Sequence, residues 1–303
     1  MNNFKKKNFK ILIIGFGSIG QQHYKALKDI KIKNNVFFLS RRIIKNKNFI
    51  TKKNIKNFNP DYIIICSNTN NHIKDVEFIE RNLKKKIVLI EKPIFDKVYK
   101  ITPKKNTYFV NYQLRFHPVI QKLKKTLSNK KILNLQISCK SYLPNWRKRD
   151  YRKSYSSKKI GGGVLLDLSH ELDYMLWIFK NIQVKYSKII KISKLQIQSN
   201  DYVFLAGKVS KGGMFSLNLT YFSKHPSRSV SVDCDNFSFH GNLIDNYYKI
   251  NSGNKQISNH FNMNQLELLK QVHKKILSKD FKDLCSFKEG LGVLKFIKKN
   301  KNN

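Results

Sequence analysis

The chain has 303 residues, enough for two domains that each bury a core. Its formal charge of +41 comes from 60 Lys and Arg against 19 Asp and Glu, a balance that would suit a nucleic acid or an anionic membrane as partner. Only eight of the basic residues are Arg, and the lysines are scattered over the whole length with many Asn and Ile, whose codons are also rich in A and T. We therefore interpret the charge as a lysine-rich solvated surface, and expect neither nucleic acid nor membrane as partner.

Four widely spaced cysteines indicate a reducing compartment. They form no C-x-x-C pair, so neither a zinc site nor a disulfide framework is expected from Cys66, Cys139, Cys234 and Cys285. The apolar run near the start is short, no small-residue cleavage site follows it, and no run approaches the ~20 residues of a membrane span. These features predict a cytoplasmic protein without a metal site.

Taken in chain order, residues 1–116 alternate short apolar runs with amphipathic stretches. The runs lie at 11–14, 36–39, 62–65, 87–90 and 108–112. Continuous apolar runs separated by helix-length segments are typical of parallel strands that are buried on both faces. The first domain is therefore predicted to be an α/β doubly wound parallel sheet of the Rossmann type.

Residues 117–303 predict a second, α+β domain that binds the substrate. A helix is expected at 118–128, a strand near 132–140, a basic and aromatic loop at 142–159 and a helix at 164–179. Alternating apolar and polar segments near 184–197, 202–209, 213–222 and 228–240 predict an open, mostly antiparallel sheet. Two further helices are expected at 262–278 and 286–299.

A glycine-rich turn follows the first predicted strand. Gly15, Gly17 and Gly20 form a G-x-G-x-x-G pattern between this strand and a helix. Such glycines allow a tight turn, close approach of the backbone to a pyrophosphate and close helix packing, while the helix N-terminus favours negative charge. We predict that this turn, with Ser18 and Ile19, binds a dinucleotide.

The end of the second predicted strand favours NADP(H). An acidic residue that bonds the ribose 2′-hydroxyl of NAD usually stands ~20 residues beyond the glycines. Ser40, Arg41 and Arg42 stand there instead, and guanidinium donors suit a 2′-phosphate. NADP(H) is the favoured cofactor and NAD(H) stays open; the alternative interpretation is a solvated strand end.

Two further groups suit acid–base chemistry. Lys92 lies in the segment Glu91-Lys92-Pro93 after the fourth strand, at a carboxyl edge where open α/β sheets bind ligands. On the helix expected after the glycines at 161–163, the spacing i, i+3, i+4, i+7 places four polar residues on one face, namely Asp167, His170, Glu171 and Tyr174. A buried structural histidine is the alternative, and the absence of a completed H-E-x-x-H pattern argues against a metal.

Together these motifs resemble the glucose-fructose oxidoreductase / inositol dehydrogenase (Gfo/Idh/MocA) family over nearly the whole chain. The glycine turn followed by His23, Thr69 and His72 after the third strand, Glu91-Lys92-Pro93, and the helix with His170 and Asp173 carry the resemblance. It implies that Lys92 contacts a substrate hydroxyl and that His170 acts as acid and base, helped by Asp167. It also implies cofactor contacts at Ser67, Thr69, His72, Glu91 and Lys92.

The segments 111–118, 142–147 and 167–173 resemble a subgroup associated with bacterial surface-polysaccharide sugar biosynthesis. The loop at 142–159 mixes Arg with aromatic residues, which suits an anionic sugar because aromatic faces cover the ring and Arg pairs with carboxylate or phosphate. We expect seven residues to contact the substrate: Arg115, Trp146, Arg147, Arg149, Tyr151, Arg152 and Tyr174. The alternative is a loop that packs on a neighbouring subunit or is solvated.

The expected function is an NAD(P)-dependent oxidoreductase that transfers a hydride between nicotinamide and a secondary hydroxyl or ketone of a sugar, sugar nucleotide or sugar acid. Two alternatives stay open: an NAD-dependent glycosidase that uses transient oxidation, and a cofactor-binding protein without catalysis. A homo-oligomer is expected.

Overall fold

The computed structural model describes residues 9–31, 35–40, 48–146, 148, 150–159, 161–209 and 212–301. By its internal contacts the chain divides into two compact units. The first contains the residues up to Phe116 together with Asn264–Leu294. The second contains His117–Met263 and the end of the chain from Lys295 onward.

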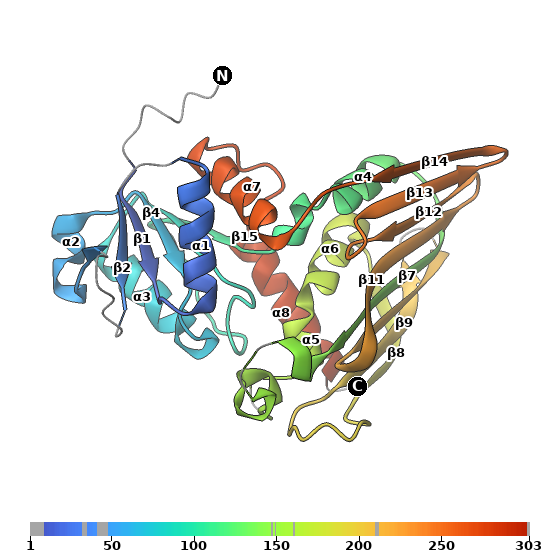
Figure 1. Ribbon diagram of the computed structural model, residues 1–303, viewed down its shortest axis with the longest axis horizontal. Helices are drawn as coiled ribbons and strands as arrows, with labels where there is room; N and C mark the ends of the chain where they lie inside the picture. The colour runs from blue at the N-terminus through green and yellow to red at the C-terminus, as the bar shows by residue number, and fades with distance from the viewer. Residues whose placement is uncertain are drawn as a thin grey trace. The chain divides into compact units, whose positions relative to one another are not determined.

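The first unit is built on a sheet whose described strands follow the order β15-β6-β5-β4-β1-β2-β3. Figure 1 labels β1, β2, β4 and β15 of this sheet. Its strands are β1 (Ile11–Ile14), β2 (Val36–Leu39), β3 (Asn48–Phe49), β4 (Tyr62–Ile65), β5 (Ile87–Ile90), β6 (Thr107–Val110) and β15 (Cys285–Ser286). Strands β1 to β6 pair in parallel, and β15 is antiparallel to β6. Every residue of β1 and β4 is buried, as expected for a sheet covered on both faces. The order from β3 to β6 is that of a Rossmann sheet, which confirms the predicted fold class.

The helices of the first unit come from both ends of the chain. They are α1 (Ser18–Asp29), α2 (Ile55–Phe58), α3 (His72–Asn82), α7 (Gln265–Leu277) and the first part of α8 (Phe287–Lys301), with the 3-10 turns η2 (Lys52–Asn54), η3 (Thr69–Asn71) and η4 (Gln113–Phe116). Helix α7 packs against α1 and η4. On the sequence alone, all residues after 116 were assigned to the second domain, whereas Asn264–Leu294 belong to the first unit. The periodicity of a helix shows that it has an apolar side, but does not show which core that side covers.

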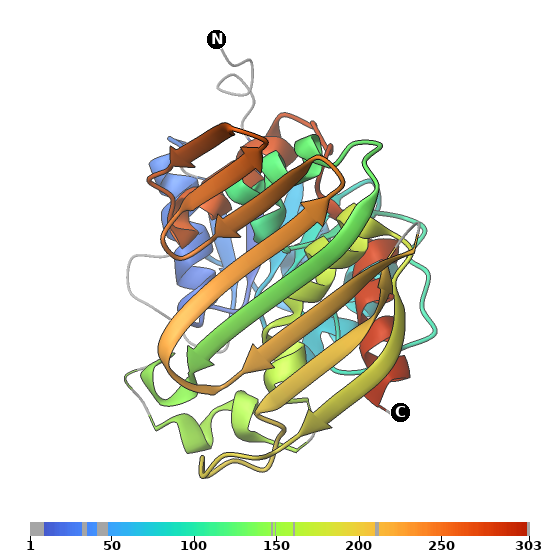
Figure 2. The same cartoon turned by 90° about the vertical axis from the view of Figure 1, so that its right-hand side faces the viewer.

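The second unit contains a larger sheet with the order β14-β13-β12-β11-β7-β10-β9-β8, which faces the viewer in Figure 2. Its strands are β7 (Ile132–Tyr142), β8 (Gln183–Ile190), β9 (Tyr202–Val209), β10 (Gly213–Thr220), β11 (Phe222–Cys234), β12 (Phe237–Asn242), β13 (Tyr247–Ser252) and β14 (Lys255–His260). Strands β7 and β10 are parallel and the other pairs are antiparallel. The mostly antiparallel sheet is thus confirmed, but β13 and β14 were not predicted. All six residues of β14 are exposed, so no apolar alternation marks it.

The predicted helix at 164–179 is broken in the structure. Helix α5 (Val164–Asp167) ends at Leu168, whose φ of −93° and ψ of 33° are not helical, and α6 (Ser169–Phe179) begins after it. At the end of α5, the Leu168 N–H donates a hydrogen bond to the Val164 carbonyl oxygen at 2.9 Å. Asp167 and His170 therefore do not share one continuous helix. The unit also contains α4 (Pro118–Thr126) and the turns η5 (Leu143–Trp146), η6 (Tyr151–Lys153) and η7 (Tyr155–Ser157).

Candidate functional site

The carboxyl edge of the parallel sheet gathers polar groups from several strands. The residues that directly follow β1, β4, β5 and β6 each donate a backbone N–H to a neighbouring strand over 2.7 to 3.0 Å, and they are Gly15, Cys66, Glu91 and Asn111. These four positions therefore stand side by side across the sheet. The strand order reverses between β1 and β4, and open α/β sheets bind ligands at such a switch point.

The glycine turn after β1 is tightly packed at its ends and open in its middle. Gly15 has a φ of +93°, and a Cβ there would lie 2.7 Å from the Cys66 carbonyl oxygen. A Cβ on Gly20 would lie 2.4 Å from the carbonyl oxygen of Gly15. At Gly17, no described atom beyond its chain neighbours lies within 4 Å of the Cβ position. Gly17 is exposed and immediately precedes α1, so the open space lies at a helix N-terminus and fits a pyrophosphate.

The other small polar and apolar residues that were predicted to contact the cofactor lie around the same edge. Five of them are exposed or half-buried, namely Ser18, Ile19, Ser40, Ser67 and Thr69. The Ser67 hydroxyl donates to a carboxylate oxygen of Asp75 in α3 at 2.6 Å. This bond fixes the loop after β4 to the helix that follows it.

His72 connects two loops from inside the protein. Its side chain is 1% exposed, its Nδ1 lies 3.1 Å from the Ile94 carbonyl oxygen, and its Nε2 lies 3.0 Å from the Ser67 carbonyl oxygen. Burial lowers the pKa of this imidazole, although both carbonyl contacts act in the opposite direction. His72, which was predicted to contact the cofactor, thus joins the loop after β4 to the loop after β5. Both of its ring nitrogens are hydrogen-bonded to backbone carbonyl oxygens of the protein.

Glu91 and Lys92 are charged residues that are adjacent in sequence and directly follow β5. Glu91 is buried, and its Oε1 accepts hydrogen bonds from His23 Nε2 at 2.7 Å and from the Asn111 amide. Burial by itself raises the pKa of the Glu91 carboxyl, but the hydrogen bond and charge of His23, the bond from Asn111 and the charge of Lys92 bring it below its ordinary value. Glu91 is therefore a carboxylate whose hydrogen bonds are made to His23 and Asn111. Lys92 is half-buried, a position from which an ammonium can donate to a ligand.

Two buried amides after β6 were missed by the sequence reasoning. Asn111 is 3% and Gln113 is 8% exposed. Among the described residues, neither Asn111 Oδ1 nor Gln113 Oε1 has a hydrogen-bond partner. Buried amide oxygens normally have a partner, so both fit a hydroxyl or amide donor of a ligand. Their signals in the sequence were their place just after a strand and the segment 111–118, which resembles the polysaccharide subgroup.

In the second unit, His170 lies in the first turn of α6 and is 8% exposed. Asp167, at the end of α5, accepts a hydrogen bond from the hydroxyl of Tyr221. Burial, and then the Asp167 charge, raise the pKa of Tyr221 and keep its proton in place. The Trp146 ring contacts Tyr221 edge-on, with 5.2 Å between the ring centroids. Tyr221 therefore connects two predicted site residues, and nothing in its local sequence indicated this.

Glu171 and Tyr174, which share α6 with His170, face the interior of the second unit. Both are 0% exposed. Glu171 pairs with Arg228 of β11, with 2.7 Å between Oε1 and Nε. The Tyr174 hydroxyl has no hydrogen-bond partner among the described residues, and burial raises its pKa. The predicted substrate residue Tyr174 is thus packed inside its unit.

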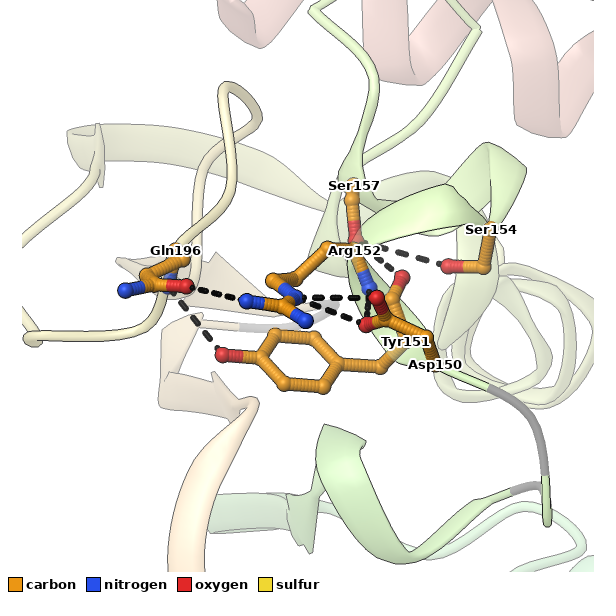
Figure 3. A network of polar contacts seen from close by, with 6 residues as sticks. All are labelled: Asp150, Tyr151, Arg152, Ser154, Ser157 and Gln196. Atoms are coloured by element: carbon orange, nitrogen blue, oxygen red, sulfur yellow. Dashed lines mark hydrogen bonds and ion pairs between the residues drawn. The ribbon is translucent and has the colours of Figure 1, made fainter.

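The basic loop at 142–159 is held by a network of polar contacts among its own residues and Gln196 (Figure 3). Arg152 Nε donates to both carboxylate oxygens of Asp150 at 2.9 and 3.0 Å, and its Nη1 donates to Gln196 Oε1 at 3.0 Å. The backbone N–H of Gln196 donates to the Tyr151 hydroxyl at 3.3 Å. Ser157 donates to the Tyr151 carbonyl oxygen at 2.7 Å. Arg152 and Tyr151, both predicted to bind substrate, therefore fasten their loop to the segment around Gln196.

Arg115 is occupied inside the first unit. Its guanidinium is 2% exposed, and Nη1 donates to Glu289 Oε1 of α8 at 3.0 Å. The charge of Arg115 also contributes to the lowered pKa of Glu289, against the effect of burial. This ion pair gives a structural reason for the arginine that the sequence assigned to substrate binding.

Four predicted site residues, Arg41, Arg42, Arg147 and Arg149, lie outside the described residues. Within the part of the chain that is described, no group of three His, Cys, Asp or Glu residues is placed to hold a metal ion. The same part contains no helix with the length and apolar character to cross a membrane.

Solved structures share this fold over nearly the whole chain, while no family model and no curated protein matches the sequence. The UDP-N-acetylglucosamine 3-dehydrogenase GnnA from Acidithiobacillus ferrooxidans has a TM-score of 0.76 and 14% identity, covering 97% of each chain. Levoglucosan dehydrogenase in complex with NADH has a TM-score of 0.77 and 13% identity, over 98% of this chain and 96% of that one. An oxidoreductase from Agrobacterium radiobacter in complex with NAD+, L-tartaric acid and magnesium has a TM-score of 0.78 and 12% identity, over 98% and 96%. The chain therefore has the fold of these dehydrogenases.

Proposed function

We propose that the chain is an oxidoreductase of the Gfo/Idh/MocA type, which transfers a hydride between a nicotinamide cofactor and a secondary hydroxyl or ketone of a sugar, sugar nucleotide or sugar acid. The observation that carries the proposal is the carboxyl edge of the parallel sheet. The open space at Gly17, the half-buried Lys92 and two unpartnered amide oxygens all follow strands of this edge. The names of the solved structures add support, since two of them hold NADH or NAD+.

Each candidate residue has a distinct role in this proposal. The backbone at the start of α1 binds the pyrophosphate, and the bound nicotinamide supplies or accepts the hydride. Lys92 donates a hydrogen bond to the substrate oxygen, and His170 takes up or returns the hydroxyl proton. Asp167 assists His170, as the resemblance implies, and Tyr221 holds the Asp167 carboxylate.

NADP(H) is the cofactor that we propose over NAD(H). The support comes from the sequence alone, where Arg41 and Arg42 replace the acidic residue that bonds the ribose of NAD. Replacing both with Ala is expected to weaken NADPH and to leave NADH nearly unchanged, because each charged hydrogen bond contributes about 1.5–3 kcal/mol.

Titration calorimetry on two glycine variants tests the cofactor site. Gly17 has a φ of −80°, which Ala adopts without strain, and no described atom outside its chain neighbours would meet the new Cβ. Gly17→Ala is therefore expected to keep the melting temperature of the wild type and to weaken NADPH and NADH at least about tenfold, or 1.4 kcal/mol. Gly292→Ala in α8 is the matched control, because its Cβ also meets open space. If Gly17→Ala binds both cofactors like the wild type, the turn is not the pyrophosphate site.

A substrate screen then tests the reaction. Keto-sugars are incubated with NADPH, and sugar nucleotides and sugar acids with NADP+, and the change in reduced nicotinamide is measured. A net change that depends on the substrate supports the oxidoreductase. Release of free sugar without a net change in NADPH would identify the glycosidase alternative instead.

A further inference from the structure

Ser67 is held at two points by side chains from the first turn of α3. Its hydroxyl donates to Asp75 Oδ2 at 2.6 Å, and its carbonyl oxygen lies 3.0 Å from His72 Nε2. Both partners are buried, with 7% of Asp75 and 1% of His72 exposed, whereas Ser67 itself is half-buried. Two buried groups thus fix the orientation of one residue that is partly open to solvent.

Ser67 lies at the point where the strand order of the parallel sheet reverses. It is the second residue after β4, and its backbone nitrogen would lie 2.8 Å from a Cβ placed on Gly15. In the proposed site the turn after β1 binds the pyrophosphate, and the end of β2 binds the adenosine ribose. The nicotinamide half of the same dinucleotide therefore lies on the side of β4, where Ser67 stands.

Asp75 is an unusual residue for its place in α3. The rest of the buried side of this helix consists of His72, Ile73, Val76 and Ile79. A carboxylate on such a side is costly unless a cation pairs with it. Among the described residues, Asp75 forms no ion pair, and Ser67 is the one side chain that hydrogen-bonds its carboxylate. The stability of the unit therefore does not explain an aspartate here, because an apolar residue would fill the same side at lower cost.

The direction of the bond between Ser67 and Asp75 follows from the charge of the carboxylate. Burial raises the pKa of Asp75, and the hydrogen bond from Ser67 opposes the rise. An ionised carboxylate has no proton to donate, so the hydrogen of the Ser67 hydroxyl points to Asp75. The Ser67 oxygen can then only accept in any further hydrogen bond.

An oxygen that can only accept selects a donor on the ligand. The phosphates of a dinucleotide offer acceptors, whereas the ribose hydroxyls and the carboxamide offer protons. The second ribose is joined directly to the pyrophosphate, and Ser67 stands beside the glycine turn that would bind this pyrophosphate. A hydroxyl of the second ribose is therefore the donor that suits Ser67.

We propose that Asp75 is a positioning residue that accepts the Ser67 hydrogen bond and so presents the Ser67 oxygen, as an acceptor, to a hydroxyl of the ribose on the nicotinamide side of the cofactor. The inference rests on the function proposed above, because it needs a nicotinamide dinucleotide at this edge of the sheet. Asp75 acts only through Ser67.

Titration calorimetry at pH 8, where the carboxylate is ionised, compares three ligands that share the adenosine end. Adenosine 2′,5′-bisphosphate lacks the second ribose, 2′-phospho-ADP-ribose contains it without nicotinamide, and NADPH contains both. Asp75→Ala is expected to weaken the last two about three- to tenfold, the value of one hydrogen bond, and to leave the first unchanged. The series ADP, ADP-ribose and NADH serves in the same way if the wild type prefers NADH.

Three results would overturn the assignment. Equal weakening of all three ligands would mean that Asp75→Ala loosens the whole site, and no weakening of any would remove the role of Asp75. A loss confined to NADPH would place the acceptor at the carboxamide instead of the ribose. Asp75→Leu, which suits the buried side of α3, replaces Asp75→Ala if that variant loses stability.

A double-mutant cycle tests whether Asp75 acts through Ser67. Ser67→Ala alone is expected to weaken NADPH by a similar factor, and Asp75→Ala is expected to add nothing in that background. Additive losses would contradict the positioning role. Asp75→Asn keeps an oxygen that can accept from Ser67, so this variant is expected to recover most of the affinity for NADPH, and an affinity as low as that of Asp75→Ala would contradict the acceptor role.

The matched control removes a carboxylate at the other end of the same strand. Asp61 directly precedes β4 and accepts the backbone N–H of Lys10 at 3.0 Å, so Asp61→Ala is expected to leave all three affinities unchanged. A loss equal to that of Asp75→Ala would mean that the site responds to any change around β4, and would overturn the proposal. A wild type that binds neither NADPH nor NADH would refute the proposed function, whereas normal binding that Asp75→Ala leaves unchanged refutes the role of Asp75 alone.

Discussion

We predict that His117 makes the second unit sensitive to acid. Its side chain is 2% exposed, its Nδ1 accepts the backbone N–H of Val119 at 3.3 Å, and its Nε2 lies 3.1 Å from Asn246 Oδ1. The Asn246 amide donates to Met263, so its oxygen accepts from Nε2–H, and the neutral ring caps the N-terminus of α4. Protonation of Nδ1 would remove this acceptor.

The magnitude follows from the shift in the pKa of His117, which burial, and to a smaller degree the charge of Arg228, lower to about 4. In the unfolded chain the ordinary pKa is about 6.5, so the unfolded state binds the proton first as the pH falls. The stabilisation from the neutral ring is present above pH 6.5 and is lost between 6.5 and 4. The free energy of unfolding should fall by about 2 kcal/mol between pH 7 and pH 5 from this group, and by about 3 kcal/mol in total.

Tryptophan fluorescence isolates the relevant unit. The only two tryptophans of the chain, Trp146 and Trp177, both lie in the second unit, and Trp177 packs under Lys124 of α4 with 3.8 Å between Nζ and the ring centroid. Urea unfolding followed by this signal at pH 7 and pH 5 gives the free energy of that unit at each pH.

His117→Asn is the variant that separates titration from packing. Asn keeps a side-chain acceptor at the N-terminus of α4 but does not titrate in this range. The variant is expected to lose less stability between pH 7 and pH 5 than the wild type, by about 2 kcal/mol, while other histidines contribute equally to both proteins. If the two proteins lose the same amount, the neutral His117 cap does not account for the acid sensitivity.

Four further substitutions have definite expectations. Gly20→Ala should lower the free energy of unfolding of the first unit by about 1–3 kcal/mol, measured by urea unfolding followed by circular dichroism, because its Cβ meets a backbone oxygen at 2.4 Å. Glu171→Gln should destabilise the second unit by about 3–5 kcal/mol, since it leaves Arg228 without its carboxylate partner, and unchanged fluorescence unfolding would contradict this. Lys92→Met and His170→Gln should each reduce kcat by about 10²–10⁴-fold with cofactor affinity retained, and an active His170→Gln enzyme would exclude that histidine as acid and base.

The parallel strands were predictable because burial on both faces leaves a continuous apolar run. The runs at 11–14, 36–39, 62–65 and 87–90 coincide with β1, β2, β4 and β5 residue for residue. A strand without a buried face leaves no such mark. Strand β14 is exposed at every position, and it was missed although it pairs with β13 through six register partners.

The polar part of the site was less predictable, because its contacts are between residues far apart in sequence. The spacing of Asp167 and His170 suggested a shared helix face, but the break at Leu168 depends on backbone geometry that the side-chain pattern does not contain. Tyr221 and His273 have no motif around them. Their partners, Asp167 and His23, lie 54 and 250 residues away.

Acidic residues are scarce in this basic chain, so each buried one marks a position of interest. The scarcity does not show what role the residue has there. Of the 19 acidic residues, six are buried, and acidic side chains are rarely buried unless they are paired: Asp75, Glu91, Asp167, Glu171, Asp173 and Asp201. Five of these have partners within the protein. Asp75 pairs with a serine, Glu91 with a histidine and an asparagine, Asp167 with a tyrosine, Glu171 with an arginine, and Asp201 with backbone N–H groups and a serine. Removing any of these five carboxylates would leave its donors without this acceptor, which is costly where the donor is buried. A buried acid with a partner therefore indicates a donor beside it, and only the position of that donor relative to a ligand edge, as for His23 and Glu91, connects it to chemistry.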